Sequence, residues 1–224
     1  IDEVVDEIRR RRITRFFLGR GLLFIALKFG LVNRLWQLSP GGWQPELYVG
    51  VLFALGAGMI LASLFLRFKP PFLLALAAAL FIVAELLVPS PERWGNLPLA
   101  APLDYLNPFL LTPGGYPQIN LWSNYPVLPW MELVFFGLAF GRWLAQEPGR
   151  AYRMAFVLGG AFLALFIPLR LLDGFGNIRQ ASGERWIDFF NLGKYPPSMT
   201  FTLLTMGVNL LLLLGMQRFQ QKLQ

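Results

Sequence analysis

Residues 189–198 read Phe-Phe-Asn-Leu-Gly-Lys-Tyr-Pro-Pro-Ser, and they lead directly into an apolar stretch that continues to about residue 215. About twenty apolar residues are enough to cross the hydrocarbon core of a bilayer as a helix. A polar, proline-containing loop followed by such a stretch is typical of a membrane protein. We therefore expect a loop of specific sequence at one membrane surface.

The composition of the whole chain supports this interpretation. Hydrophobic residues make up 55% of the 224 residues and charged residues only 15%, against about 25% charged in an average soluble domain. The apolar residues are clustered in six segments, which predicts an all-α, polytopic bundle of about six transmembrane helices in contact with the lipid bilayer. We place these helices near residues 16–36, 46–66, 70–88, 127–145, 151–172 and 197–215.

The basic residues are unevenly distributed between the connections. If six helices alternate in direction, the arginine-rich N-terminal arm, two short connections and the tail share one membrane surface. Basic residues collect on the cytoplasmic side, so we expect both termini in the cytoplasm and the protein in the inner cell membrane. The net charge of +7 then indicates topology and not nucleic-acid binding. The expected divisions are a basic arm (1–15), a six-helix domain (16–216) and a cytoplasmic tail (217–224).

Two residue types are absent from the sequence, and their absence excludes several kinds of chemistry. There is no cysteine and no histidine. Thiolate nucleophiles, Ser-His-Asp triads and sites built from His and Cys ligands are therefore excluded within this chain. We assign no metal ligand and identify no catalytic residue.

Among the ionisable residues inside the predicted helices are Lys28, Glu85 and Glu132. An unpaired charge in a bilayer is costly, so such residues usually face a partner or a water-filled cavity. An ion pair of Lys28 with Glu132 or Glu85 is one interpretation, and a substrate cavity is the other. A desolvated carboxylate at either glutamate could also serve as a general base.

Small residues recur on two of the predicted helices. Gly137 and Gly141 form a G-x-x-x-G pattern, and Gly56, Gly58 and Ala62 lie together on another helix. Small residues let helices approach closely. We expect these positions to pack within the molecule and not to form a dimer interface.

Polar and aromatic residues are concentrated in the loops at the other surface. Rings stack on sugars and amides hydrogen-bond to polar groups, so these residue types suit a sugar or a lipid headgroup. The same types also form ordinary loops, and composition does not separate the two interpretations. The residues concerned are Asn107, Asn120, Trp122, Asn124, Tyr125, Arg170, Asn177, Asn191, Lys194, Tyr195 and Ser198.

Several short motifs carry a family resemblance. Lys-Tyr-Pro-Pro-Ser at 194–198 is the most specific, and Arg-Gly-Leu at 20–22, Tyr-Pro-Val-Leu-Pro-Trp at 125–130 and Arg170 with the turn at 173–177 support it. Taken in their order along the chain, these motifs resemble those of the bacterial relatives of heparan-α-glucosaminide N-acetyltransferase. The resemblance implies the C-terminal portion of a transmembrane acyltransferase-like fold that uses acetyl-CoA.

The resemblance also implies roles for individual residues. Arg170, Asn177, Asn191, Lys194 and Tyr195 would line an outer substrate mouth, where Lys194 would bind an anionic group and Tyr195 would stack on the substrate. A catalytic base would come from a segment before residue 1 or from another chain.

The chain departs from the family at several positions, which leaves a second interpretation open. The family's Asp-His pair would precede residue 1, Ala84-Glu85 stands where His-Asn is expected, and Lys28 and Glu132 replace Glu and Gly. The alternative is a non-catalytic subunit that kept the fold and packs with other membrane subunits, or with copies of itself. A transporter is a weaker alternative because the sequence has no inverted repeat.

Overall fold

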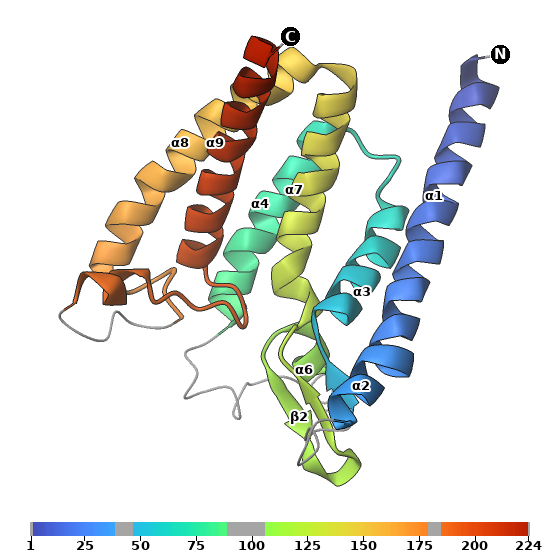
Figure 1. The fold of residues 1–224 in the computed structure, drawn as a ribbon, viewed down its shortest axis with the longest axis vertical. Coiled ribbons are helices and arrows are strands. Elements are labelled where there is room, and N and C mark those ends of the chain that lie inside the picture. Colours follow the sequence, from blue (N-terminus) through green and yellow to red (C-terminus); the bar gives the residue numbers. More distant parts are fainter. Residues whose placement is uncertain (1, 39–46, 89–105, 179–184, 224) are drawn as a thin grey trace.

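The structure, a computed structural model, describes residues 2–38, 47–88, 106–178 and 185–223. Six long helices form its framework over these ranges (Figure 1). They are α1 (Asp2–Leu27), α3 (Val51–Leu64), α4 (Pro70–Leu87), α7 (Val127–Gln146), α8 (Pro148–Leu172) and α9 (Met199–Leu223).

The expected membrane bundle is confirmed, with one difference in the second helix. In the described part of the chain, five helical segments are long and apolar enough to cross a membrane: 10–37, 70–87, 127–146, 148–172 and 199–222. The helix α3 has only 14 residues. It begins at Val51 and not near residue 46, because residues Leu47–Val49 form the strand β1.

The first helix is longer than the apolar segment that predicted it. From α1 the chain continues without a break through a π-helical turn, η1 (Lys28–Val32), into α2 (Asn33–Gln37). Arginine is a good helix former, and no proline interrupts residues 2–37. The basic arm is therefore part of the same helix as the first membrane segment.

Proline residues begin two of the other helices. Pro70 is the first residue of α4 and Pro148 the first residue of α8. Proline suits the first turn because its missing N–H would have no partner there, and because its φ is already close to the helical value.

A small sheet lies at one end of the bundle. It contains β1, β2 (Gly114–Tyr116) and β3 (Leu121–Ser123), in the order β1-β3-β2. Strand β1 runs parallel to β3, with Tyr48 opposite Trp122, and β2 runs antiparallel to β3. The short helices α6 (Asn107–Leu110) and η3 (Pro117–Ile119) complete this region. The sheet was not expected from the sequence, where residues 47–49 were assigned to a helix.

The two ends of the bundle differ in charge. The start of α1 and the end of α9 lie at the same end, together with the α3–α4 and α7–α8 connections (Figure 1). We call this the arginine-rich end. The sheet, α6, and the described residues between α8 and α9 (173–178 and 185–198) form the opposite end, which we call the loop end. Described basic residues at the arginine-rich end are Arg10, Arg11, Arg12, Arg15, Arg67, Lys69, Arg150, Arg153, Arg218 and Lys222.

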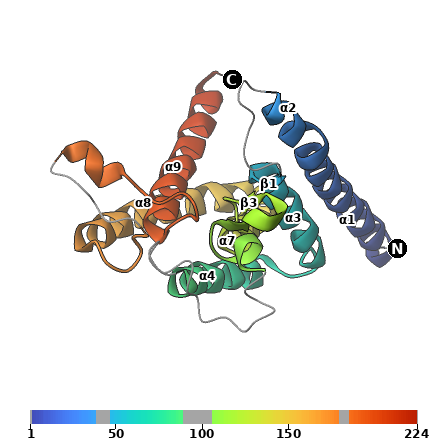
Figure 2. The same cartoon turned by 90° about the horizontal axis from the view of Figure 1, so that it is seen from below.

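The helices pack mainly in three pairs: α1 with α3, α4 with α7, and α8 with α9. Figure 2 shows α7 in the centre, where it also contacts α3 and α8. A Cβ added at Gly56 would lie 2.5 Å from the carbonyl oxygen of Gly21, so α1 and α3 approach where both have glycine. Gly159 and Gly207 play the same part between α8 and α9.

The glycine pattern on α7 does not pack as expected. No atom of the described residues lies within 4 Å of a Cβ added at Gly137 or Gly141. These glycines instead line a cavity of about 420 Å³ with Phe17 and Leu138. The prediction of close intramolecular packing was right for Gly56 and wrong for the Gly137–Gly141 pair.

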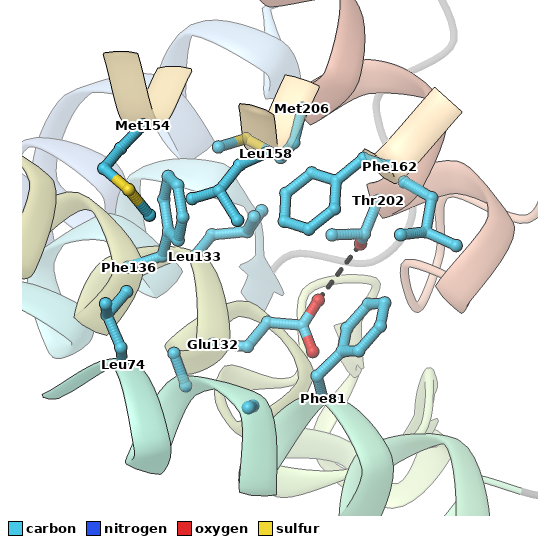
Figure 3. A pocket seen from close by; sticks show the side chains of 13 residues that line it. Leu74, Phe81, Glu132, Leu133, Phe136, Met154, Leu158, Phe162, Thr202 and Met206 are labelled. Atoms are coloured by element: carbon cyan, nitrogen blue, oxygen red, sulfur yellow. Dashed lines mark hydrogen bonds between the residues drawn. The ribbon is translucent and has the colours of Figure 1, made fainter. Parts of the chain in front are cut away.

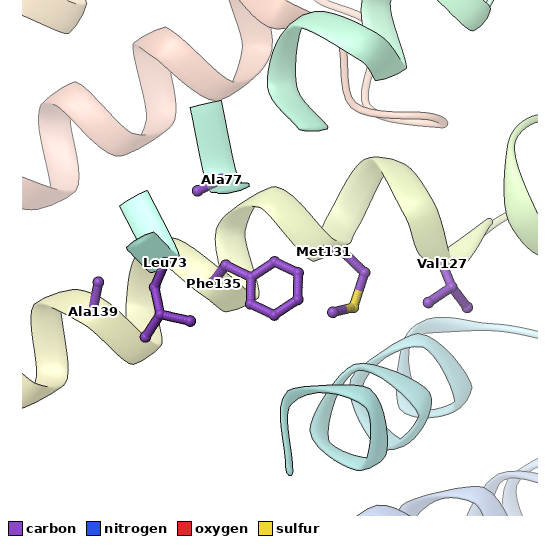
Figure 4. Packing of buried hydrophobic residues seen from close by; sticks show 6 residues of the cluster. All are labelled: Leu73, Ala77, Val127, Met131, Phe135 and Ala139. Atoms are coloured by element: carbon purple, nitrogen blue, oxygen red, sulfur yellow. The ribbon is translucent and has the colours of Figure 1, made fainter. Parts of the chain in front are cut away.

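The largest contiguous apolar cluster lies between α4 and α7. Leu73 of α4 is fully buried and faces Phe135 and Ala139 of α7, while Val127 and Met131 extend the cluster toward the loop end (Figure 4). These α7 positions recur every four residues, which places them on one face of the helix. This cluster holds α7 against α4. Glu132, described below, projects from α7.

Candidate functional site

Arg170 is buried and organises the loop end. Only 1% of the residue is exposed. Its Nε donates to the carbonyl oxygen of Phe189 at 2.8 Å, and its Nη2 donates to the carbonyl oxygens of Asp188 and Asn191 at 3.1 Å each. These bonds hold the 3₁₀ helix η4 (Trp186–Phe190) against the end of α8. The Arg170 guanidinium therefore faces the protein interior and does not line a surface mouth.

Asn177 has a similar internal role. Its Nδ2 donates to the carbonyl oxygen of Leu169 at 2.8 Å, and its Oδ1 accepts from Arg170 Nη1 at 2.9 Å and from Thr200 Oγ1 at 3.1 Å. The turn after α8 is thereby fastened to both α8 and α9. Asp173, in a left-handed conformation at the end of α8, adds an ion pair to Arg170 at 3.5 Å.

The Pro-Pro-Ser part of the loop motif starts α9. The Oγ of Ser198 accepts a hydrogen bond from the backbone N–H of Phe201 at 3.1 Å, which is the usual arrangement of a helix N-cap. Glu85 of α4 accepts from the N–H of Met199 at 2.9 Å and also from the backbone of Gly176. A carboxylate suits this position because free N–H groups and the helix dipole favour negative charge at a helix N-terminus.

Tyr195 and Lys194 are two predicted site residues whose side chains remain accessible. The hydroxyl of Tyr125 donates to the hydroxyl of Tyr195 at 2.9 Å, and the two rings meet edge to face at 4.9 Å. The ammonium of Lys194 lies 5.1 Å from the centroid of the Tyr195 ring. Tyr125 itself is buried and packs on Trp130 with 5.5 Å between ring centroids. Asn191 is exposed beside them, but its described contacts are made by its backbone.

The two tyrosines of this pair have different acidities. The hydrogen bond from Tyr125 lowers the pKa of the Tyr195 phenol below its ordinary value, and the positive charge of Lys194 acts in the same direction. Burial raises the pKa of Tyr125, and its bond to Tyr195 raises it further. Tyr195 is therefore the member of the pair that gives up its proton first.

Lys28 lies in an aromatic cage and not in the expected ion pair. Its ammonium is 4.7 Å from the ring centroid of Trp36 and 4.6 Å from that of Tyr48. The residue is only 2% exposed. Aromatic faces attract a cation in such positions. Among the described residues Lys28 forms no ion pair, because the carboxylates of Glu85 and Glu132 are bound at the start of α9, so the predicted pairing was wrong.

Tyr48 of this cage also takes part in a series of side-chain hydrogen bonds across the sheet. Asn124 Nδ2 donates to the hydroxyl of Tyr48 at 3.0 Å, and Trp122 Nε1 donates to Asn124 Oδ1 at 2.6 Å. The parallel pairing of β1 with β3 brings Tyr48 and Trp122 together. Burial raises the pKa of Tyr48, and the Tyr195 phenol lies close enough to add to the effect. The Lys28 cage and the Tyr125–Tyr195 pair thus belong to one region of the loop end.

Four side chains at the loop end have buried polar atoms with no hydrogen-bond partner in the described part of the chain. They are the amide of Asn33, Oδ1 of Asn107, Oγ of Ser123 and Nε1 of Trp130. Native proteins pair most buried polar atoms. Of these residues, Trp130 packs on Tyr125 and therefore lies next to the Tyr125–Tyr195 pair.

Glu132 lines a separate cavity inside the bundle. The cavity holds about 280 Å³ and lies between α4, α7, α8 and α9. Its walls are apolar except for Glu132, which is 6% exposed, and Thr202, whose Oγ1 donates to Glu132 Oε1 at 3.0 Å (Figure 3). The prediction of a cavity at an intramembrane charge thus fits Glu132. Thr202 was missed, although a hydroxyl three residues inside an apolar helix could have signalled it.

A third cavity lies at the arginine-rich end. It holds about 310 Å³ between the start of the first membrane segment and the end of α3. Arg10, Arg11 and Arg67 line it together with the hydroxyl residues Thr14 and Ser63. A basic cavity with hydroxyls is suited to phosphate groups, because arginine binds them through paired hydrogen bonds. In the described ranges no group of three His, Cys, Asp or Glu residues could hold a metal ion.

Comparison with known protein families shows a match over most of the chain. Residues 7–167 match the sequence family described as heparan-alpha-glucosaminide N-acetyltransferase, catalytic. The matched stretch is more than two thirds of the 224 residues. It includes Lys28, Glu85, Tyr125 and Glu132, whereas the loop residues from Arg170 to Ser198 lie beyond its end. No curated protein and no solved structure matches the chain.

Proposed function

The chain belongs to the family of the heparan-alpha-glucosaminide N-acetyltransferase catalytic region, and we propose that it takes part in acyl transfer at the membrane. A polar acceptor would bind at the loop end and the acyl donor, acetyl-CoA, at the arginine-rich end. The observation that carries the proposal is the accessible Tyr195–Lys194 pair, held in place by the buried Tyr125. We also propose that the arginine-rich end faces the cytoplasm, as the distribution of basic residues favours.

The chemistry of the loop end favours a sugar-like acceptor. The ring of Tyr195 offers a stacking surface, and Lys194 offers a cation for an acidic substituent. The family's name describes acetyl transfer to the amine of a glucosaminide, and an amino sugar has both the apolar face and the polar edges that such a surface would bind.

Proton transfer would fall to Tyr195. When an amine or hydroxyl attacks an acyl group, it loses its proton as the new bond to the acyl carbon forms and the bond from that carbon to its carrier breaks, and a nearby base accelerates the step. Because acetyl-CoA would bind at the opposite end of the bundle, the acetyl group would first pass from its thioester to a carrier group that reaches the loop end, and that carrier would be the leaving group. With no histidine in the chain, we assign this role to the Tyr195 oxygen. Tyr125 donates a hydrogen bond to that oxygen and Lys194 lies beside the ring, so both stabilise the phenolate.

The basic cavity at the arginine-rich end fits the phosphates of acetyl-CoA. Three arginines and two hydroxyl residues line about 310 Å³ of space, and arginine is the side chain best suited to phosphate oxygens. Acetyl-CoA would supply the activated acetyl thioester. Arg67, three residues after the end of α3, would contribute one of the cations that hold its phosphates.

The test uses the purified full chain in lipid nanodiscs. Binding of acetyl-CoA is measured by calorimetry, and acetyl transfer is measured with radiolabelled acetyl-CoA and glucosamine. We expect Arg67→Gln to weaken acetyl-CoA binding about tenfold, while Arg218→Gln, at the same end on α9, leaves it unchanged. Tyr195→Phe should abolish transfer and leave acetyl-CoA binding intact. Wild-type protein that binds no acetyl-CoA would contradict the proposal.

A non-catalytic role in a complex remains the second candidate, and one observation favours it. Leu172, Trp186 and Leu171 at the loop end of α8 and in η4 are 78%, 77% and 69% exposed. Large apolar side chains clustered at one edge are typical of a surface that meets a partner or the membrane interface. Fixed co-purification of another membrane protein, lost in a Trp186→Ser variant, together with absence of acetyl-CoA binding would favour this candidate.

A further inference from the structure

We propose that the cavity around Glu132 binds a single-chain lipid that carries a hydroxyl group. The hydroxyl would donate a hydrogen bond to Glu132, and the hydrocarbon chain would lie along the apolar wall. This site is separate from the loop-end and arginine-rich sites, and the proposal does not depend on acyl transfer at either of them.

The position of the cavity favours a ligand that comes from the bilayer. Its lining residues all belong to helices α4, α7, α8 and α9, each of which is long and apolar enough to cross a membrane. The helices pack tightly as the pairs α4–α7 and α8–α9, and the cavity lies where these two pairs face each other. A molecule dissolved in the membrane can reach such a place without passing through either aqueous surface.

The polar groups of the cavity define what the ligand must offer. Glu132 Oε1 accepts from Thr202, and its Oε2 has no hydrogen-bond donor among the described residues. A buried carboxylate oxygen without a donor is costly in an apolar surrounding. A hydroxyl can hydrogen-bond to the free carboxyl oxygen, and it brings no charge into the cavity. A carboxylate or phosphate headgroup would instead place a negative charge among apolar side chains, with no Lys or Arg in the lining to neutralise it.

The arrangement of the lining fits an amphiphile with its polar group toward the loop end. Glu132 is five residues after the start of α7 and Thr202 three residues after the start of α9, both of which begin at the loop end. At about 1.5 Å per residue the polar pair is within about 8 Å of that end. Leu74 and Met154 lie on the side of the cavity away from Thr202 (Figure 3).

The size of the cavity restricts the ligand to one chain. Its volume of about 280 Å³ is close to the lower limit of about 300 Å³ for small-molecule sites. A phospholipid with two acyl chains and a headgroup needs several times this space. A fatty alcohol or a short isoprenoid alcohol is therefore the class that matches both the volume and the single free acceptor.

The test is photolabelling of the full chain in liposomes by hexadecanol that carries a diazirine on its chain. Labelled peptides are identified by mass spectrometry, and unlabelled hexadecanol, hexadecane and palmitate are added as competitors. We expect labelling of the cavity-facing parts of α7, α8 and α9, and competition by hexadecanol at least about tenfold stronger than by hexadecane or palmitate. Equal competition by hexadecane, or labelling spread evenly over lipid-facing residues, would overturn the proposal.

Matched variants separate the roles of the polar group and of the space. Glu132→Leu should remove the preference for hexadecanol over hexadecane, and Glu132→Met, which also lacks a group that can hydrogen-bond strongly, gives the same comparison should the leucine variant not fold. Leu158→Trp fills the cavity and should abolish labelling there. Leu165→Trp on the same helix, at a residue 53% exposed, should leave it unchanged. Undiminished preference for hexadecanol in both Glu132 variants would contradict the assignment.

Discussion

The hydroxyl of Tyr125 donates a hydrogen bond to the hydroxyl of Tyr195 at 2.9 Å, across 70 positions of sequence. One residue stands just before α7 and the other just before α9, so the bond joins the starts of two membrane helices. It also leaves the Tyr195 oxygen accessible beside Lys194 while Tyr125 is buried. The relationship thus links the packing of the bundle to the chemistry proposed at the loop end.

We predict that the Tyr195 phenol ionises below the ordinary tyrosine value of about 10. Because its folded-state pKa is lowered, it contributes stability above that pKa, and this is lost as the pH falls through it. The raised pKa of Tyr125 acts in the opposite direction above pH about 10. An ultraviolet titration of tyrosinate should show an early transition that disappears in Tyr195→Phe.

Two further variants control this measurement. Tyr125→Phe removes the donor, so the early transition should move back toward the ordinary value and not vanish. Tyr152→Phe, near the arginine-rich end, should leave the early transition unchanged. An early transition that persists in Tyr195→Phe would show that another tyrosine carries it.

Arg170→Met should be strongly destabilising. The buried guanidinium donates to three carbonyl oxygens and to Asn177 Oδ1, and its removal leaves these acceptors unpaired in the interior. We expect a loss of about 3–5 kcal/mol, measured by thermal unfolding in detergent. Arg185→Met is the matched control, because that side chain is 80% exposed in its ion pair with Asp188, and it should change stability little. Comparable losses in both variants would contradict the internal role of Arg170.

Alanine at two glycines should have effects of opposite sign. Gly56→Ala places a Cβ 2.5 Å from the Gly21 carbonyl oxygen, so α1 and α3 must separate and the melting temperature should fall. Gly137→Ala meets nothing within 4 Å and should raise stability by up to about 1 kcal/mol through helix propensity. Both are read by thermal unfolding. A fall for Gly137→Ala similar to that for Gly56→Ala would mean that α7 packs differently from the structure.

Lys28→Met should be tolerated. The ammonium loses its contacts with the Trp36 and Tyr48 rings, worth about 0.5–2 kcal/mol, but the cost of burying the charge also disappears. We expect a net change within about 1 kcal/mol. Breaking a buried ion pair would instead cost about 3–5 kcal/mol, so a loss of that size in thermal unfolding would restore the ion-pair interpretation. Tyr48→Leu, which removes one ring and leaves the charge, should be worse than Lys28→Met.

Much of the fold could be predicted from local sequence. The apolar segments located the long helices, and the starts predicted near residues 70 and 151 lie within a few residues of the observed starts at Pro70 and Pro148. The strand β1 was assigned to a helix because Leu-Tyr-Val is apolar and adjoins an apolar helix. Its strand partner β3 lies far along the chain, and no periodicity within three residues can reveal such a pairing.

The candidate site was predicted only in part. Lys194 and Tyr195 are accessible at the loop end, as expected, but Arg170 and Asn177 point inward. All four lie close together in sequence and have polar side chains. A polar side chain can hydrogen-bond either to a substrate or to backbone carbonyl oxygens of the protein itself, and its residue type does not distinguish the two. Only the positions of the carbonyl oxygens around it in the folded structure show which it does.

The sequence by itself determined that this chain crosses a membrane several times with its basic residues at one end, because hydrophobicity and charge act additively along the chain and need no partner. The tertiary structure decided which charges meet which groups. Lys28 contacts two aromatic rings, and Glu85 accepts a hydrogen bond from the backbone at the start of α9. Glu132 accepts a hydrogen bond from Thr202 and lines a cavity. Such pairings depend on distances of a few ångströms between helices remote in sequence, and these distances exist only once the helices have packed.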